Sequence, residues 1–104
     1  MITDFFNKAT EDIYNGKTSK EAQNLLPAEL VPLAQHRLDF LNNVDCFYDL
    51  KSLPELEVRV LHGRRKGQCS IKIAGDYYIC FAFDECWYKV KRAVITKLRM
   101  RKGA

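Results

Sequence analysis

The segment from residue 68 to residue 83 constrains the fold of this chain more than any other part of it. Two runs rich in apolar, β-branched and aromatic residues, 68–74 and 77–83, are separated only by Gly75 and Asp76. A two-residue break that contains glycine is typical of a tight β-hairpin, because glycine adopts the positive φ that the turn needs. The segment therefore predicts two antiparallel strands joined by a short turn.

The first of these runs alternates between apolar and polar side chains. Cys69, Ile71 and Ile73 fall on one side of an extended chain. Ser70 and Lys72 fall on the other side, because successive side chains of a strand point to opposite faces. We therefore expect one face of the sheet to be buried and the other to be accessible to solvent.

Two further runs are expected to extend this sheet. Residues 87–95 are rich in aromatic and β-branched side chains and follow a turn at Asp84 and Glu85. Residues 56–60 alternate between aliphatic and charged side chains, as a half-buried strand does. The two faces of this second run are Leu56, Val58 and Val60 against Glu57 and Arg59.

The N-terminal half is expected to be mainly helical after a first edge strand at residues 1–6. Residues 9–14, closed by a glycine, predict a brief helix. A longer helix is predicted from Pro27, which suits a first turn, to about Asn42 and Asn43, which tolerate the left-handed conformation found after helix ends. Its spacing of three and four residues is set by Leu30, Leu33, Ala34, Arg37, Leu38 and Leu41.

Helices followed by strands predict an α+β fold, with the longer helix packed on one face of a mainly antiparallel, twisted sheet. The other face is then free for function. At 104 residues the chain is long enough for one hydrophobic core and too short for two, so residues 1–104 are expected to form a single domain. Residues 97–104 are expected to form a basic, flexible tail.

Membrane, secretion and metal signals are not expected in this chain. Its longest apolar stretch, 77–83, is far shorter than the roughly 18 residues of a membrane span. The first residues lack the basic start and apolar run of a secretory signal, which indicates a cytoplasmic location. The four cysteines form no CxxC pair, so we expect no metal and no cofactor. Cys69 and Cys80 are expected to pack as small buried hydrophobes.

The charges are divided unevenly along the chain. Residues 1–57 contain five Lys/Arg and ten Asp/Glu, a net charge of −5, whereas residues 58–104 contain twelve and three, a net charge of +9. Separation of this size within one domain indicates a surface that binds a polyanion. The alternative is a basic face that is simply solvated.

The densest group of cations lies between two of the expected strands. Gly63 and Gly67 flank Arg64, Arg65 and Lys66. The planar guanidinium of arginine binds phosphate oxygens in pairs and lysine adds a compact charge, so such a turn suits a phosphodiester backbone.

The stretch HGRRKGQCSIKI, from His62 to Ile73, together with residues 77–83, resembles the signature region of HigB-type toxins of the RelE/ParE superfamily. The opening segments 8–13 and 15–17 are also similar to the start of that family. The resemblance implies a RelE-like fold and a ribosome-dependent messenger-RNA endoribonuclease that inhibits translation. It also implies neutralisation by a cognate HigA-like antitoxin.

Cleavage in that superfamily begins with attack of a ribose 2′-hydroxyl on the adjacent phosphate, so protons must be moved and negative charge stabilised. The resemblance implies that His62, Arg65 and Lys72 carry this chemistry, because they match the basic catalytic positions of the family. The basic residues that follow position 86 either contact RNA or belong to a final strand with a solvated end. The remaining candidate RNA contacts are Arg59, Arg64, Lys66, Tyr78, Lys89, Lys91 and Arg92.

Two departures from the family pattern leave two functions open. Tyr78 stands where related toxins have an arginine, and residues 90–96 read VKRAVIT where those toxins close on a Tyr-His pair. The first interpretation is an active endoribonuclease. The second is an RNA- and antitoxin-binding protein with weak or lost nuclease activity. A DNA-binding regulator has little support, because no helix carries a basic recognition face.

Overall fold

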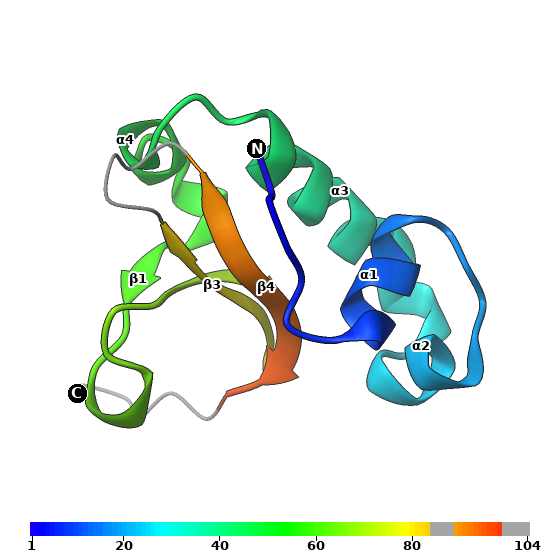
Figure 1. Ribbon diagram of the computed structural model, residues 1–104. Helices are drawn as coiled ribbons and strands as arrows, with labels where there is room; N and C mark the ends of the chain where they lie inside the picture. Colours follow the sequence, from blue (N-terminus) through cyan, green and yellow to red (C-terminus); the bar gives the residue numbers. More distant parts are fainter. Residues whose placement is uncertain (84–88, 99–104) are drawn as a thin grey trace.

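The computed structural model describes residues 1–83 and 89–98, and these residues have the predicted α+β class. The sheet comprises β1 Arg59–Val60, β2 Cys69–Ala74, β3 Tyr77–Phe83 and β4 Val90–Lys97. The strands are antiparallel and lie side by side in chain order (Figure 1). The bounds of β2 and β3 confirm the predicted hairpin, and Gly75 in its turn has a φ of 56°.

The first residues of the chain run beside β4, but they form two isolated bridges rather than the edge strand predicted for residues 1–6. Ile2 and Phe5 form parallel bridges with Val90 and Ala93. The backbone N–H of Thr3 donates to the Val90 carbonyl at 2.8 Å, so the N-terminal segment is held by main-chain hydrogen bonds. This pairing closes the free edge of β4 within the described part of the chain.

The helices are α1 Lys8–Tyr14, α2 Lys20–Leu25, α3 Val31–Asn43 and α4 Phe47–Lys51, and a 3-10 turn, η1 Ala28–Leu30, precedes α3. The short helix α1 confirms the prediction for residues 9–14. The longer predicted helix is confirmed as α3 except at its start, because the first turn after Pro27 is the 3-10 turn η1. The other two span six and five residues, too few to show a clear periodicity in the sequence. No helix in the described ranges is long and apolar enough to cross a membrane.

The hydrophobic core lies between α3 and one face of the sheet. Leu38 and Leu41 of α3 belong to the same buried cluster as Ile71, Ile79 and Phe81 of the hairpin. Burial of side chains of this size stabilises the fold by about 1.5–3 kcal/mol each. In Figure 1 the helices α1, α2 and α3 gather on one side of β4, and the loop between β1 and β2 lies at the opposite side of the molecule.

The strand predicted for residues 56–60 is wrong in its length. Leu56, the first residue of the predicted strand, instead ends a second 3-10 turn, η2 Pro54–Leu56. This turn starts at Pro54 because proline fixes φ near the value that a 3-10 turn needs. Glu57 then adopts a left-handed backbone, with φ 47° and ψ 55°, which interrupts extended structure. Val60, predicted on the apolar face, is 53% exposed because β1 is an edge strand of only two residues.

Two chain-end predictions also need correction. The last strand covers Val90–Lys97 rather than 87–95, and Lys97 therefore belongs to the sheet and not to a flexible tail. The predicted turn and first aromatic residues of that strand, at 84–88, and residues 99–104 lie outside the described residues. The prediction for the end of α3 is right in position, but Val44 after it is extended rather than left-handed.

Candidate nucleic-acid interface

The sheet face opposite the core, called the outer face below, is arranged in rows by strand register. In one row Arg59 lies opposite Ser70, which lies opposite Cys80. In the next row Lys72 lies opposite Tyr78. Directly opposed residues of antiparallel strands share a face. The outer face therefore consists of Arg59, Ser70, Lys72, Tyr78, Cys80, Val94 and Thr96.

Glu57 joins this face through its side chain. The register that pairs Arg59 with Ser70 would place Glu57 opposite Lys72, and the Lys72 Nζ lies 3.5 Å from the Glu57 Oε2. The two side chains are 35% and 47% exposed, so this ion pair is accessible from solvent. A left-handed backbone costs a residue with a Cβ about 1–2 kcal/mol. Glu57 keeps this conformation while its N–H donates to the Pro54 carbonyl at 3.1 Å.

The loop between β1 and β2 folds so that Arg65 lies close to the outer face. The loop contains a 3-10 turn, η3 Gly63–Arg65, and Gly63 and Gly67 have φ values of 67° and 89°. The half-buried Arg65 donates from Nη1 to the Gln68 Oε1 at 3.3 Å. Gln68 shares the strand parity of Ser70 and Lys72, so this bond holds Arg65 at the border of the outer face. Burial raises the pKa of the Cys80 thiol, and the positive charge of Arg65 offsets part of that rise.

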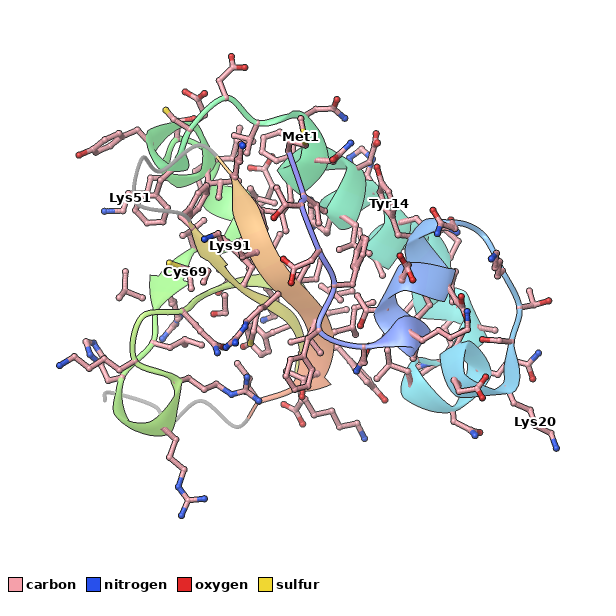
Figure 2. The ribbon with its side chains drawn as sticks, in the orientation of Figure 1. Met1, Tyr14, Lys20, Lys51, Cys69 and Lys91 are labelled. Carbon is pink, nitrogen blue, oxygen red and sulfur yellow. The ribbon has the colours of Figure 1, made fainter. Side chains whose placement is uncertain are left out.

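Exposed cations surround this part of the sheet. Arg64 and Lys66 are exposed on the loop, and Lys91 and Arg92 are exposed on β4. Figure 2 shows Lys91 beside β4 and several nitrogen-bearing side chains around the loop. Lys89, the remaining predicted contact of this group, is also exposed.

Arg92 sits at an irregularity of β4. The register of β3 and β4 shifts between Cys80 and Ala82, and Arg92 has a φ of 55°. Its N–H donates to the Asp4 Oδ1 at 3.0 Å, so the N-terminal segment supports this bulge. Bulges change the direction of side chains, and they occur often beside functional sites.

The predicted catalytic residues are not all brought together. Arg65 and Lys72 both belong to the outer face or its border, whereas His62 is exposed where the chain leaves β1 and enters η3. The Leu61 N–H donates to the Gln68 carbonyl, and four strand residues, about 13 Å, separate Gln68 from Lys72. His62 and Lys72 thus lie near opposite ends of β1.

Some side chains of the outer face are less accessible than predicted. Tyr78 is only 8% exposed, which favours packing over stacking on a base. Ser70 and Cys80 are fully buried, so the face opposite the core is not open along its whole length. Within the described residues, the Ser70 Oγ has no hydrogen-bond partner. Cys69 and Cys80 are buried free thiols, as predicted.

Three residues near this interface were not among the predicted site residues. Strand parity placed Glu57 on the same face as Arg59, but nothing in the sequence indicated that the Glu57 side chain contacts Lys72. Asp4 is 88 residues from the backbone N–H that it accepts from, so no local pattern could reveal it. Gln68, the partner of Arg65, follows a glycine at the end of the loop and carries no distinctive signal.

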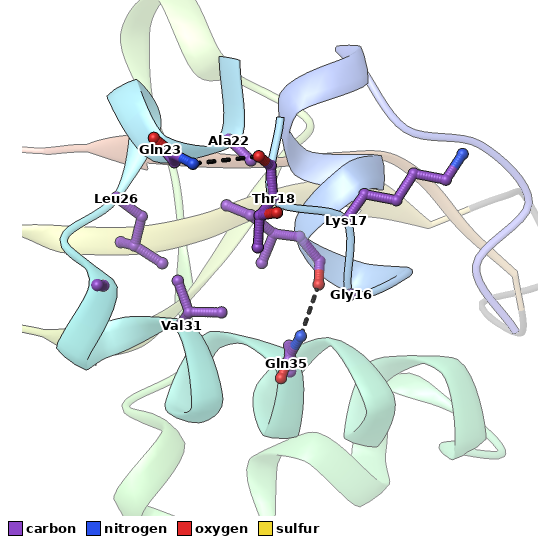
Figure 3. A pocket seen from close by; sticks show the side chains of 10 residues that line it. Gly16, Lys17, Thr18, Ala22, Gln23, Leu26, Val31 and Gln35 are labelled. Atoms are coloured by element: carbon purple, nitrogen blue, oxygen red, sulfur yellow. Dashed lines mark hydrogen bonds between the residues drawn. The ribbon is translucent and has the colours of Figure 1, made fainter. Parts of the chain in front are cut away.

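A separate pocket lies on the helical side of the molecule (Figure 3). It has a volume of about 470 Å³ and is lined mainly by aliphatic side chains, including Ile13, Leu26 and Val31. Gln35 lines one side of the pocket, and its side-chain amide donates to the Ile13 carbonyl at 3.0 Å. Gln23 likewise donates to the Thr18 carbonyl at 3.1 Å, so both glutamine amides of the lining are already bonded to the backbone.

Neither metal chemistry nor a relative assigns a function to this surface. Among the residues that the structure describes, no group of three or more His, Cys, Asp or Glu side chains could hold a metal ion. The chain matches no protein-family model, and no curated protein matches its sequence. The function of this surface is therefore inferred from its residues and from where they lie.

Proposed function

We propose that this protein is a HigB-type toxin with a RelE-like fold that binds messenger RNA on the ribosome and cleaves it. The observation that carries the proposal is the arrangement of cations around one face of the sheet. Arg59 and Lys72 occupy neighbouring rows of the outer face, and Arg65 borders it through its bond to Gln68. A surface of this kind suits a phosphodiester chain, because each neutralised phosphate releases counterions.

The proposed reaction requires a phosphate held near groups that transfer protons. Arg65 and Lys72 would contact phosphate oxygens and stabilise the charge that develops in the transition state. His62 would transfer a proton, since imidazole is the side chain best suited to that role near neutral pH. Arg59, Arg64, Lys66, Lys91 and Arg92 would hold the RNA on either side. The reaction needs no cofactor.

A cognate HigA-like antitoxin is the proposed protein partner. The family resemblance implies it, and the exposed cations of the loop and β4 would attract an acidic surface. A toxin that acts on translating ribosomes would work in the cytoplasm.

A second candidate function is RNA and antitoxin binding with weak or lost cleavage. The burial of Tyr78 favours it, because Tyr78 replaces an arginine of the family and is too enclosed to contribute to phosphate binding. The two functions share the same surface and differ in whether bonds are broken.

The test compares ribosome-bound messenger-RNA cleavage and RNA affinity across a salt series. His62→Gln should reduce cleavage by about 10²-fold or more and leave affinity nearly unchanged. Arg65→Ala and Lys72→Ala should weaken both, and each lost phosphate contact should flatten the salt dependence by about one unit of slope. Lys20→Ala, on α2 and far from the loop, is the matched control.

The results separate the candidates. If the wild-type protein binds RNA without cleaving it, the second function replaces the first. If the Lys20 variant loses as much affinity as the Lys72 variant, binding depends on net charge and not on the outer face.

A further inference from the structure

Glu57 is a carboxylate on a face whose other charged residues, Arg59 and Lys72, are basic. Among the described residues that make up the outer face, it is the one acid, and it lies two residues before Arg59 and 3.5 Å from the Lys72 ammonium. A negative charge in this position repels phosphate and reduces the affinity for RNA. RNA binding therefore does not explain why a carboxylate occupies this position.

The backbone of Glu57 is also unusual. Within the described ranges, Glu57 and Arg92 are the non-glycine residues with positive φ. Glycine and asparagine adopt this conformation more readily than glutamate. Residues held in disfavoured conformations occur often at active sites, where the surrounding structure keeps them in place. Here the η2 turn and the ion pair with Lys72 hold the carboxylate at the border of the outer face.

The geometry points to Glu57 as the general base of the proposed ribonuclease, with Lys72 as the residue that positions it. This inference rests on the proposed function and supplies a proton acceptor in a chain that lacks the family's terminal Tyr-His pair. The Lys72 ammonium keeps the carboxylate directed at the outer face, and its remaining N–H groups can contact the phosphate.

The reaction balances with the groups at hand. Glu57 takes the proton of the ribose 2′-hydroxyl, and the 2′-oxygen forms a bond to phosphorus. The bond from phosphorus to the 5′-oxygen breaks, and that oxygen leaves with a proton from His62. The products are a 2′,3′-cyclic phosphate and a 5′-hydroxyl, and nothing is oxidised or reduced.

Glu57 and His62 lie at opposite ends of the β1 segment, with Arg59 between them. The attacking and leaving oxygens are in line on opposite sides of phosphorus, so a base and an acid must flank it.

The Glu57→Gln variant distinguishes a general base from a carboxylate that only pairs with Lys72 or only repels phosphate. The variant should cleave ribosome-bound messenger RNA about 10²-fold more slowly or worse. It should also bind a short single-stranded RNA roughly two- to five-fold more tightly, because a repulsive charge has been removed. Opposite changes in cleavage and affinity are not expected of a residue that only neutralises Lys72.

Glu55→Gln is the matched control. It removes the same charge from an exposed residue of η2, two positions away, and should leave cleavage within about two-fold of wild type. An RNA that carries a single 2′-deoxy nucleotide at the cleaved position should resist the wild-type protein, because the proton that Glu57 removes is missing.

Chemical rescue protects the test against misfolding. Glu57→Gly suits the positive φ and should fold as well as wild type, as judged by its thermal transition. Added formate should restore part of its cleavage, since the free carboxylate can occupy the vacated space, and should not stimulate His62→Gln. Recovery with formate supports the assignment, and a folded Glu57→Gly variant that formate does not stimulate overturns it.

Different results would contradict the proposed activity and the role of Glu57. If the wild-type protein cleaves and Glu57→Gln cleaves equally well, Glu57 is not the base but the proposed function stands. If the wild-type protein does not cleave RNA at all, both the proposed activity and the role of Glu57 are overturned.

Discussion

At the scale of single residues, Asp12 and Ser19 connect two helices of the N-terminal half. The Ser19 hydroxyl donates to the Asp12 Oδ2 at 2.7 Å and accepts from the Ala22 N–H, so it also caps α2. The hydrogen bond from Ser19 lowers the pKa of Asp12, and the charges of Lys8 and Lys17 act in the same direction although burial opposes them. One hydroxyl therefore supports both a helix start and a buried carboxylate.

Ser19→Ala should destabilise the protein by about 1–2 kcal/mol, because the helix cap and the bond to Asp12 are lost together. Urea unfolding at pH 7 measures this change. Ser52→Ala, which removes one exposed hydrogen bond to the Asp49 carbonyl, should cost less. Equal effects of the two substitutions would contradict the double role of Ser19.

The Asp12 pair also predicts a dependence on pH. A carboxyl whose pKa is lower in the folded than in the unfolded state stabilises the fold above the ordinary pKa, and the contribution disappears as the pH falls through the lowered value. Wild-type stability should therefore fall below about pH 4, near the ordinary pKa of aspartate, and should fall less steeply in the Ser19→Ala variant.

At the scale of elements, the β2-β3 hairpin depends on the backbone of one turn residue. Gly75 has a φ of 56°, and a Cβ built on it meets no atom within 4 Å. A substitution there is disfavoured by the backbone conformation alone, without a steric clash against neighbouring elements.

Gly75→Ala should lower the free energy of unfolding by about 1–2 kcal/mol, whereas Gly75→Asn should cost less because asparagine tolerates a left-handed backbone. Chemical unfolding of both variants measures the difference. Equal stability of the alanine variant and wild type would mean that the turn does not require a positive φ.

At the scale of the whole molecule, the division of charge follows the division of structure. The acidic residues 1–57 contain the helices α1 to α4, and the basic residues 58–104 contain the strands β1 to β4. The helical layer and the sheet thus carry opposite charges. An approaching polyanion is attracted to the sheet side and repelled by the helical side, which orients the encounter.

The proposed antitoxin partner predicts a growth phenotype. Expression of the wild-type protein alone should inhibit bacterial growth, and expression with the product of the neighbouring reading frame should restore growth and yield a stable complex. Lys72→Ala, in which both RNA binding and cleavage should be weakened, should inhibit growth less at equal protein levels. Harmless expression of wild type at a high level, with no co-purifying partner from the native operon, would contradict the proposal.

Features that depend on local spacing could be predicted from the amino-acid sequence. Alternation of apolar residues defined β2, and a glycine turn followed by a short apolar run defined β3 as its partner. A spacing of three and four residues defined α3. The concentration of cations after residue 57 was equally visible. Each of these signals lies within a short window, so no knowledge of distant contacts was needed.

The contacts between side chains depend on how the whole chain packs and could not be predicted from local spacing. Alternation assigns a residue to a face but does not choose its neighbour, and the contact of Glu57 with Lys72 follows from the pairing of β1 with β2. The burial of Tyr78 and the support of the Arg92 bulge by Asp4 also depend on segments far apart in the chain. The strand predicted from residue 56 failed for a related reason, since η2 and a left-handed Glu57 replace its first half. Register, burial and backbone strain arise only when the whole chain packs.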